Sequence, residues 1–278
     1  MPQYRYTQVD VFTEQPLLGN PLAVVHAADG LSDAQMQLFA RWTNLSETAF
    51  LLTPADPRAD YRVRIFTPNG ELPFAGHPTL GSCHAWLTSG GQPQSGEEAM
   101  QECGVGLVRV RLSGQRAAFA APPLRMTPVE ESVLQPVLAA LGLSSQVVQG
   151  AMWLDNGPTW LGLLLDDERT VLGIEPDHAA LKSLCKVGVV SPRRGEGDTS
   201  FEVRGFAAAI GINEDPVTGS LNASLAQWLI GADLAPAHYV AAQGTALGRV
   251  GRVYIDKIGD TVWVGGSSVN CIEGQLTL

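Results

Sequence analysis

Two segments of the chain predict helices that carry no fully ionised side chain. The first, "HPTLGSCHAWL", begins after Gly76, and the second, "SLNASLAQWLIG", begins after Gly219. A helix without a charged face is normally buried on most of its sides, and small residues let surrounding strands approach it closely. Each helix therefore predicts an α+β domain in which a curled, mostly antiparallel β-sheet surrounds one central helix.

The two helices occupy matching places in two halves of the chain. In each half a phenylalanine on a strand precedes a glycine turn, a helix of small residues and a tryptophan. The offsets in residue number are 140 from Phe66 to Phe206, 143 from Gly76 to Gly219 and 142 from Trp86 to Trp228. Three offsets that agree so closely, in the same strand–loop–helix order, predict a duplicated domain.

The chain length agrees with two domains, because 278 residues suit one large or two mid-sized cores. The pattern breaks at "APPLRMTPVEES", where we expect Thr127 to cap a new helix and Pro128 to be its first residue. We therefore predict an N-terminal domain over residues 1–124 and a C-terminal domain over 125–278, with the last few residues able to pack back on the first. Earlier, Ser32 is predicted to cap a helix over "DAQMQLFARWT".

Composition excludes several classes of protein. The formal net charge of −10, with Arg193-Arg194 as the sole basic doublet, argues against nucleic acid as a partner. Four cysteines without any CxxC pair argue against a zinc site or a disulfide framework and are typical of a reducing cytoplasm. No signal peptide and no apolar run long enough for a membrane span is present. We expect a cytoplasmic protein without a metal.

The N-terminal ends of the two helices are the predicted binding positions. The first N–H groups of a helix lack partners within it, and the helix dipole favours an anion at that end. Gly76 and Gly219 would let a ligand approach the backbone closely. Two such ends facing one cleft would bind a carboxylate or stabilise an enolate-like charge. The structural alternative is that each glycine only forms its turn.

Four side chains near these ends are candidates for the chemistry. Glu47, in "NLSETAFLL", is a surface turn residue unless it is covered, in which case burial raises its pKa toward the range of a general base. His77 is either a turn residue or a neutral proton donor or acceptor. Asp215, before a proline, is either a capping residue or a functional one, and Ser220 has the same two interpretations. Cys83 is predicted to be a buried helix residue.

Several ordered motifs resemble the PhzF-like family of phenazine biosynthesis isomerases. They are "VDVFTEQPLLGNPLAVV", "NLSETAFLL", "RIFTPNGELPFAGHPTLGS" and "GINEDPVTGSLNASLAQWL", followed by Gln243-Gly244 and Gly265-Gly266. The family is similar in fold to diaminopimelate epimerase, with two related domains, each a β-structure around a central helix. The resemblance implies a homodimer that uses no cofactor and has its active site between the domains.

The resemblance also implies roles for the candidate residues. Glu47 would remove and return a proton on a substrate carbon, His77 and Asp215 would assist, and Ser220 with the backbone around Gly76 and Gly219 would hold a carboxylate. We thus predict a cofactor-independent isomerase that moves a proton between carbons of a small carboxylate-bearing substrate. The alternatives are a protein that binds small carboxylates without turnover, and a racemase with a cysteine pair at the two helix starts.

Overall fold

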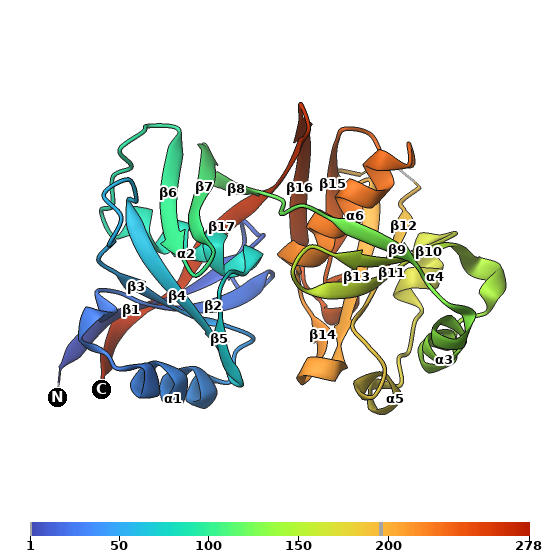
Figure 1. Cartoon of the computed structure of the whole chain (residues 1–278), viewed down its shortest axis with the longest axis horizontal. Helices are drawn as coiled ribbons and strands as arrows, with labels where there is room; N and C mark the ends of the chain where they lie inside the picture. The colour runs from blue at the N-terminus through green and yellow to red at the C-terminus, as the bar shows by residue number, and fades with distance from the viewer. Residues whose placement is uncertain (1, 195–196) are drawn as a thin grey trace. The chain divides into compact units, whose positions relative to one another are not determined.

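A computed structural model describes residues 2–194 and 197–278 and divides the chain into two compact units (Figure 1). One unit comprises the residues up to Ala120 together with Gly265–Leu278, and the other comprises Ala121–Val264. Each unit surrounds one uncharged helix with β-strands, so the predicted α+β architecture of two duplicated domains is confirmed. None of the helices in the described parts of the chain has the length and apolarity needed to cross a membrane.

The first unit is a closed ring of strands. Its elements are β1 (Gln3–Val11), β2 (Asn20–Val25), α1 (Asp33–Thr43), β3 (Thr48–Leu52), β4 (Tyr61–Thr67), β5 (Gly70–Leu72), α2 (Gly76–Thr88), β6 (Glu98–Cys103), β7 (Gly106–Ser113), β8 (Arg116–Ala120) and most of β17 (Thr261–Thr277). The strands pair in the order β17, β1, β2, β3, β4, β6, β7 and β8, and β8 pairs with β17 again. β5 pairs with β4 as a short additional strand.

Helix α2 is the first of the two predicted central helices. From Gly76 to Cys83 every residue is buried. Gly81 lies where an added Cβ would approach Leu22 and Val11 within 2.8 Å, so the helix backbone packs closely on β1 and β2. The small residues of α2 are thus explained by the strands that surround it, as the sequence predicts.

Helix α1 covers a smaller apolar cluster of the same unit. Ser32 caps it in a capping box with Gln35, which confirms the predicted start of the helix. Met36 and Phe39 on its inner face pack with Phe50 and other buried residues of the unit. The apolar period of the segment therefore faces the sheet, and its polar residues face solvent.

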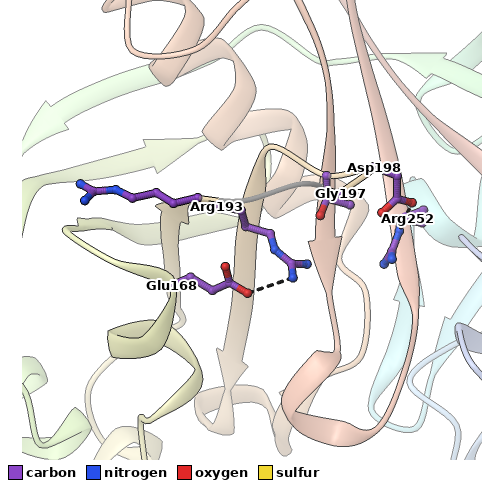
Figure 2. A pocket seen from close by; sticks show the side chains of 7 residues that line it. Glu168, Arg193, Gly197, Asp198 and Arg252 are labelled. Atoms are coloured by element: carbon purple, nitrogen blue, oxygen red, sulfur yellow. Dashed lines mark hydrogen bonds and ion pairs between the residues drawn. The ribbon is translucent and has the colours of Figure 1, made fainter.

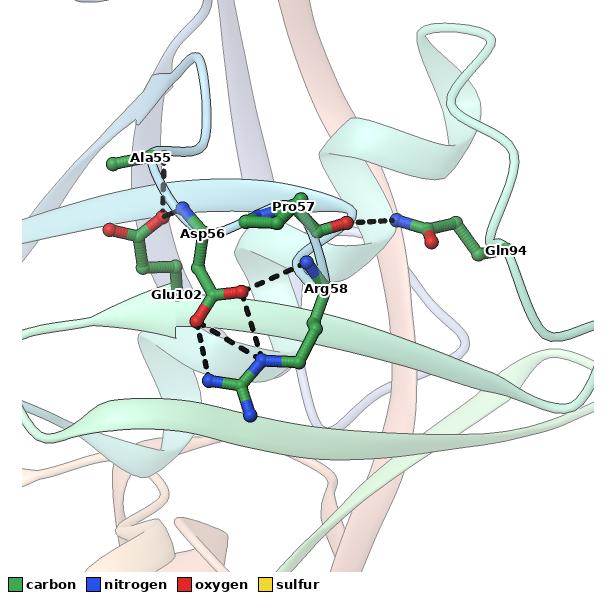
Figure 3. Close-up of polar contacts among 6 residues, drawn as sticks. All are labelled: Ala55, Asp56, Pro57, Arg58, Gln94 and Glu102. Atoms are coloured by element: carbon green, nitrogen blue, oxygen red, sulfur yellow. Dashed lines mark hydrogen bonds and ion pairs between the residues drawn. The ribbon is translucent and has the colours of Figure 1, made fainter.

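Polar contacts hold the connection between β3 and β4 onto β6 (Figure 3). Glu102 Oε2 accepts hydrogen bonds from the N–H groups of Ala55 at 2.7 Å and Asp56 at 3.1 Å. The Arg58 guanidinium donates to both oxygens of Asp56, and Gln94 Nε2 donates to the carbonyl of Pro57. These contacts fix a loop that has no regular secondary structure.

The second unit repeats the arrangement with longer connections. Its elements are β9 (Arg125–Pro128), α3 (Glu131–Leu141), β10 (Val148–Asp155), β11 (Thr159–Leu165), α4 (Glu168–Leu172), α5 (His178–Lys182), β12 (Val187–Pro192), β13 (Phe201–Ala207), β14 (Ile212–Asp215), α6 (Gly219–Gly231), β15 (His238–Gln243) and β16 (Gly251–Ile258). Helix α6 is the second central helix, and ten of its residues are buried.

The predicted start of α3 is wrong. Thr127 and Pro128 lie on β9, where they pair with Trp153 and Met152 of β10. The helix begins only at Glu131. A strand partner that lies beyond the helix in the sequence overrides the local capping signal, as tertiary pairing often does.

Strand pairings show that the two units share one topology. In the first unit β2–β3 and β4–β6 are parallel, while β3–β4 and β6–β7 are antiparallel. The second unit has the same sequence of pairings in β11–β12, β12–β13, β13–β15 and β15–β16. Phe66 pairs with Thr48, and Phe206 pairs with Val187, so the register of the duplication can be read residue by residue.

An arginine–glutamate pair is repeated in this register. In the first unit Arg64 forms two hydrogen bonds of 2.7 Å with Glu71. In the second unit Arg204 forms two bonds of 2.9 Å with Glu214. Both guanidinium groups lie over the ring of the phenylalanine that follows on the same strand, Phe66 or Phe206. The second pair is the more deeply buried, and it ties β14 to β13.

Because β8 closes on β17, two glycines of β17 should differ in how much their replacement by alanine lowers stability. A Cβ at Gly265 would lie 2.7 Å from the carbonyl oxygen of Ala117 on β8. We expect Gly265→Ala to lower the free energy of unfolding by about 1–3 kcal/mol, as overpacking does. Gly274 lies on the same strand with open space around it, so Gly274→Ala is the matched control and should change stability by less than about 0.5 kcal/mol. Equal urea midpoints for the two variants would contradict the closure of β8 on β17.

Candidate active site

The N-terminus of α2 carries the predicted residues Gly76 and His77. Ala75, in an extended conformation, caps the helix with its backbone, and the N–H of Thr79 already bonds to its carbonyl. Pro78 has no N–H, so the amides of Gly76 and His77 are the first-turn donors that the helix itself does not use. The His77 side chain is only 5% exposed, which places its imidazole within the protein at this helix end.

Glu47 contacts His77 although the two residues belong to separate segments of the chain. It lies between α1 and β3, and its Oε2 atom is 3.5 Å from His77 Nδ1. The carboxylate is 16% exposed, and among the described residues Oε2 has no hydrogen-bond partner. Burial raises the pKa of Glu47, while the neighbouring Ser46 side chain acts in the opposite direction. The structure therefore places a desolvated carboxyl against a buried imidazole, which is a suitable environment for proton transfer.

The N-terminus of α6 carries the other predicted residues. Thr218 is the N-cap, so the interpretation of Asp215 as the cap of this helix is wrong. Asp215 instead ends β14, and its Oδ2 accepts a 2.6 Å hydrogen bond from the Thr218 hydroxyl. Gly219 begins the helix and is buried. The preceding residue, Glu214, bonds to Arg204. Asp215 is therefore held by its own contact with Thr218 and by the contact of its neighbour in the chain.

Gln243, on β15, supports this helix start through one side-chain amide. Its Oε1 accepts from the N–H of Thr218 at 3.0 Å and from Asn222 Nδ2 at 2.7 Å. Its Nε2 donates to the Thr218 hydroxyl at 3.0 Å and to the carbonyl of Asp215 at 3.1 Å. Because the Thr218 oxygen accepts from Gln243, its own hydrogen is directed to Asp215. From the sequence, Gln243 was only part of a family motif, with no role of its own.

Ser220 is anchored by two residues of the second unit. Trp160 Nε1 donates to the Ser220 hydroxyl oxygen at 3.3 Å, and Asn156 Nδ2 donates to the Ser220 carbonyl at 3.0 Å. Trp160 is 3% exposed, so the Ser220 hydroxyl accepts its hydrogen bond from a buried indole. No sequence signal near Ser220 indicated Trp160, because the two residues are 60 positions apart in the chain.

The predicted site residues thus form two groups. Glu47, His77 and Gly76 lie together at the start of α2, and Asp215, Gly219 and Ser220 lie together at the start of α6. Within the residues that the structure describes, no cluster of histidine, cysteine and acidic side chains has the arrangement of a metal site.

Neither helix start carries a thiol. Cys83, the cysteine of α2, lies well inside the helix and is completely buried, and burial raises its pKa to about 12. The other three cysteines lie at positions 103, 185 and 271, outside both central helices. A racemase mechanism that needs a cysteine pair at the two helix starts is therefore excluded for this chain.

A separate cavity of about 120 Å³ in the second unit is lined by charged residues (Figure 2). Arg193 bonds to Glu168 at 2.9 Å, and Arg252 bonds to Asp198 at 2.7 Å. Arg193 is also 3.3 Å from Glu202, which is fully buried. Burial raises the pKa of Glu202 to about 7, against opposing effects of Thr245, Arg193 and Arg252. These ion pairs satisfy the arginines within the chain.

Glu202 predicts a pH dependence of stability. Because its pKa is higher in the folded protein than in the unfolded chain, its contribution to stability is complete below the unfolded pKa and is lost as pH rises through about 7. We expect the stability of Glu202→Gln relative to the wild type to increase between pH 5 and pH 8, measured by urea unfolding. A difference that is constant over this range would contradict the shift.

The contacts of Gln243 predict a large loss of stability when its side-chain amide is removed. Gln243→Leu leaves the buried N–H of Thr218 without its acceptor and removes one of the two acceptors of the Asn222 side-chain amide, so we expect a loss of about 2–5 kcal/mol in the free energy of unfolding. Gln135→Leu is the matched control, because Gln135 is exposed and its side chain bonds to Glu131 one turn earlier on the same helix, and it should change stability by less than about 0.5 kcal/mol. Chemical denaturation measures both, and similar small losses would show that the amide is not needed.

Comparison with known proteins identifies the family of this chain. Residues 9–274 match the family described as phenazine biosynthesis-like protein, PhzC-PhzF. The chain is 38% identical to "Antisense-enhancing sequence 1" of Schizosaccharomyces pombe, with 99% of each protein covered. It is 34% identical to trans-2,3-dihydro-3-hydroxyanthranilate isomerase of Pseudomonas aeruginosa, with 99% of this chain and 100% of that protein covered.

Solved structures extend the similarity to the fold. A PhzF-family phenazine biosynthesis protein of Bacillus anthracis superposes with a TM-score of 0.88 at 21% identity, and the whole of both chains is covered. A hydroxyproline epimerase from Agrobacterium vitis superposes with a TM-score of 0.63 at 14% identity, over 99% of this chain and 92% of that one. The fold is therefore of the diaminopimelate-epimerase-like type, and the chain belongs to the phenazine biosynthesis-like family as an isomerase.

Proposed function

We propose that this isomerase moves a proton between two carbon atoms of a small carboxylate-bearing substrate, with Glu47 as the group that removes and returns the proton. The observation that carries the proposal is the contact of the desolvated Glu47 carboxyl with the buried His77 imidazole. A carboxyl with a raised pKa holds an abstracted proton more firmly than an exposed one does, so it is suited to both halves of the transfer.

The proposed reaction neither gains nor loses a proton overall. Glu47 as the carboxylate takes a proton from a carbon next to an unsaturated system, and the electron pair of the broken C–H bond delocalises into that system. Glu47, now a carboxylic acid, delivers the proton to a second carbon, and the double bond ends in a new place. His77 stabilises the ionised carboxyl before the first step and again after the second. Only acid and base groups take part, so the proposal includes no cofactor.

The family resemblance assigns further roles to groups of the second unit. Asp215, held by Thr218, would orient a polar substituent, and the amides of Gly219 and Ser220 would stabilise a carboxylate or the developing negative charge. A carboxylate substrate is supported by the named substrate of the Pseudomonas relative, because an anthranilate carries that group.

Hydrogen exchange with solvent tests the role of Glu47. We expect the wild type, incubated in D₂O with trans-2,3-dihydro-3-hydroxyanthranilate, to place deuterium on carbon as it isomerises the compound. Glu47→Gln keeps the shape of the side chain but cannot accept the proton, so deuterium uptake should fall by about 10²–10⁴-fold. Mass spectrometry and proton NMR of the product measure the uptake.

The matched control is Glu97→Gln, because Glu97 is an exposed glutamate of the same unit. That variant should exchange at the wild-type rate. Deuterium uptake by Glu47→Gln at the rate of the control would contradict the assignment of Glu47 as the acid/base.

A further inference from the structure

The register of the duplication assigns a partner position to Glu47 in the second unit. Glu47 precedes Thr48, which pairs with Phe66, and Lys186 precedes Val187, which pairs with Phe206. The second unit therefore carries a lysine where the first carries the proposed acid/base. By the same register the helix residue that corresponds to His77 is Ser220, the second residue of α6.

A tryptophan connects Lys186 to Ser220. The Lys186 ammonium lies 4.9 Å from the centroid of the Trp160 ring, and the indole N–H of the same residue donates to the Ser220 hydroxyl. Trp160 corresponds to Leu22 of the first unit, because the next residue of each strand, Leu161 or Ala23, pairs with the start of β12 or β3. The second unit thus has a cation, an indole and a hydroxyl in the place of a carboxylate, a leucine and an imidazole.

The Lys186 ammonium has no ion-pair partner among the residues that the structure describes. The side chain is half-buried, and within residues 2–194 and 197–278 it forms no ion pair. Burial lowers the pKa of Lys186, and the negative charge of Asp155 only partly offsets this. A partly desolvated cation gains more from an incoming anion than an exposed lysine does, because less water separates the two charges. The ring beneath it also holds the ammonium in one direction.

We propose that Lys186 determines the specificity of this enzyme for carboxylate substrates by binding the carboxylate beside Ser220. The inference rests on the proposed function, whose substrate it describes more closely by naming the groups that would bind its carboxylate. The aromatic face of Trp160 favours a substrate whose carboxylate is attached to a planar, unsaturated ring or chain.

A pair of probes that differ in charge tests this role. The probes are 3-hydroxyanthranilate and its neutral amide, 3-hydroxyanthranilamide, and isothermal titration calorimetry measures the dissociation constants. We expect the wild type to bind the carboxylate at least about tenfold more tightly than the amide. Lys186→Met should weaken binding of the carboxylate by about tenfold or more and leave binding of the amide nearly unchanged. Lys186→Arg, which keeps the charge, should retain most of the preference.

Lys182→Met is the matched control, because Lys182 is an exposed lysine at the end of α5 in the same unit. It removes the same charge and should leave both dissociation constants unchanged. Equal weakening of both probes by Lys186→Met would assign Lys186 a structural role and overturn the proposal. Wild-type protein that binds neither probe, or both equally, would overturn it as well.

The binding experiment can fail independently of the exchange experiment that tests the proposed function. Probe binding is an equilibrium measurement that needs no proton transfer, and Glu47→Gln should bind 3-hydroxyanthranilate while it loses deuterium exchange. A failure of Glu47 as the base therefore appears in the exchange experiment, and a failure of Lys186 appears in the charge preference.

Discussion

A helix that carries no charged face must be enclosed, and this constraint determines the rest of the structure. Helix α2 has nine buried residues and α6 has ten, so strands must surround each helix along most of its length. Enclosure leaves the ends of the helix as the places where its backbone can meet a ligand. At the N-terminal ends the dipole and the amides that the helix does not use favour negative charge. The position of the candidate residues at these ends follows from the same burial that stabilises the fold.

The two units keep one framework and differ in the side chains at its helix starts. The bonded arginine–glutamate pair with its phenylalanine is present in both, so it belongs to the framework. At the position where the first unit has Leu72, paired with Ile65, the second has Asp215, paired with Gly205. Glycine at that partner position leaves space that Thr218 and Gln243 approach. Substitutions of this kind after a duplication leave one candidate acidic residue in each unit, Glu47 in the first and Asp215 in the second. The topology of the two units stays the same.

The sequence predicted the features that depend on local patterns. Uncharged helices, glycine turns and repeated offsets identified α2, α6 and the duplicated fold, because each motif can be recognised within one short segment. It failed at Thr127, where a distant strand outweighs a local cap. It also missed Gln243, whose contacts with Thr218 require the parallel pairing of β13 with β15. The Glu47–His77 contact likewise joins two separate segments, so only the family resemblance, and no local pattern, assigned both residues to one site.

The protonation of Glu47 itself tests the central claim most directly. Carboxyl ¹³C NMR of protein labelled at glutamate side chains, with Glu47→Gln used to assign its signal, follows each carboxyl through a pH titration. We predict that Glu47 titrates above the range of the exposed glutamates, because burial raises its pKa. A Glu47 signal that titrates together with the exposed glutamates would contradict the desolvation of this carboxyl.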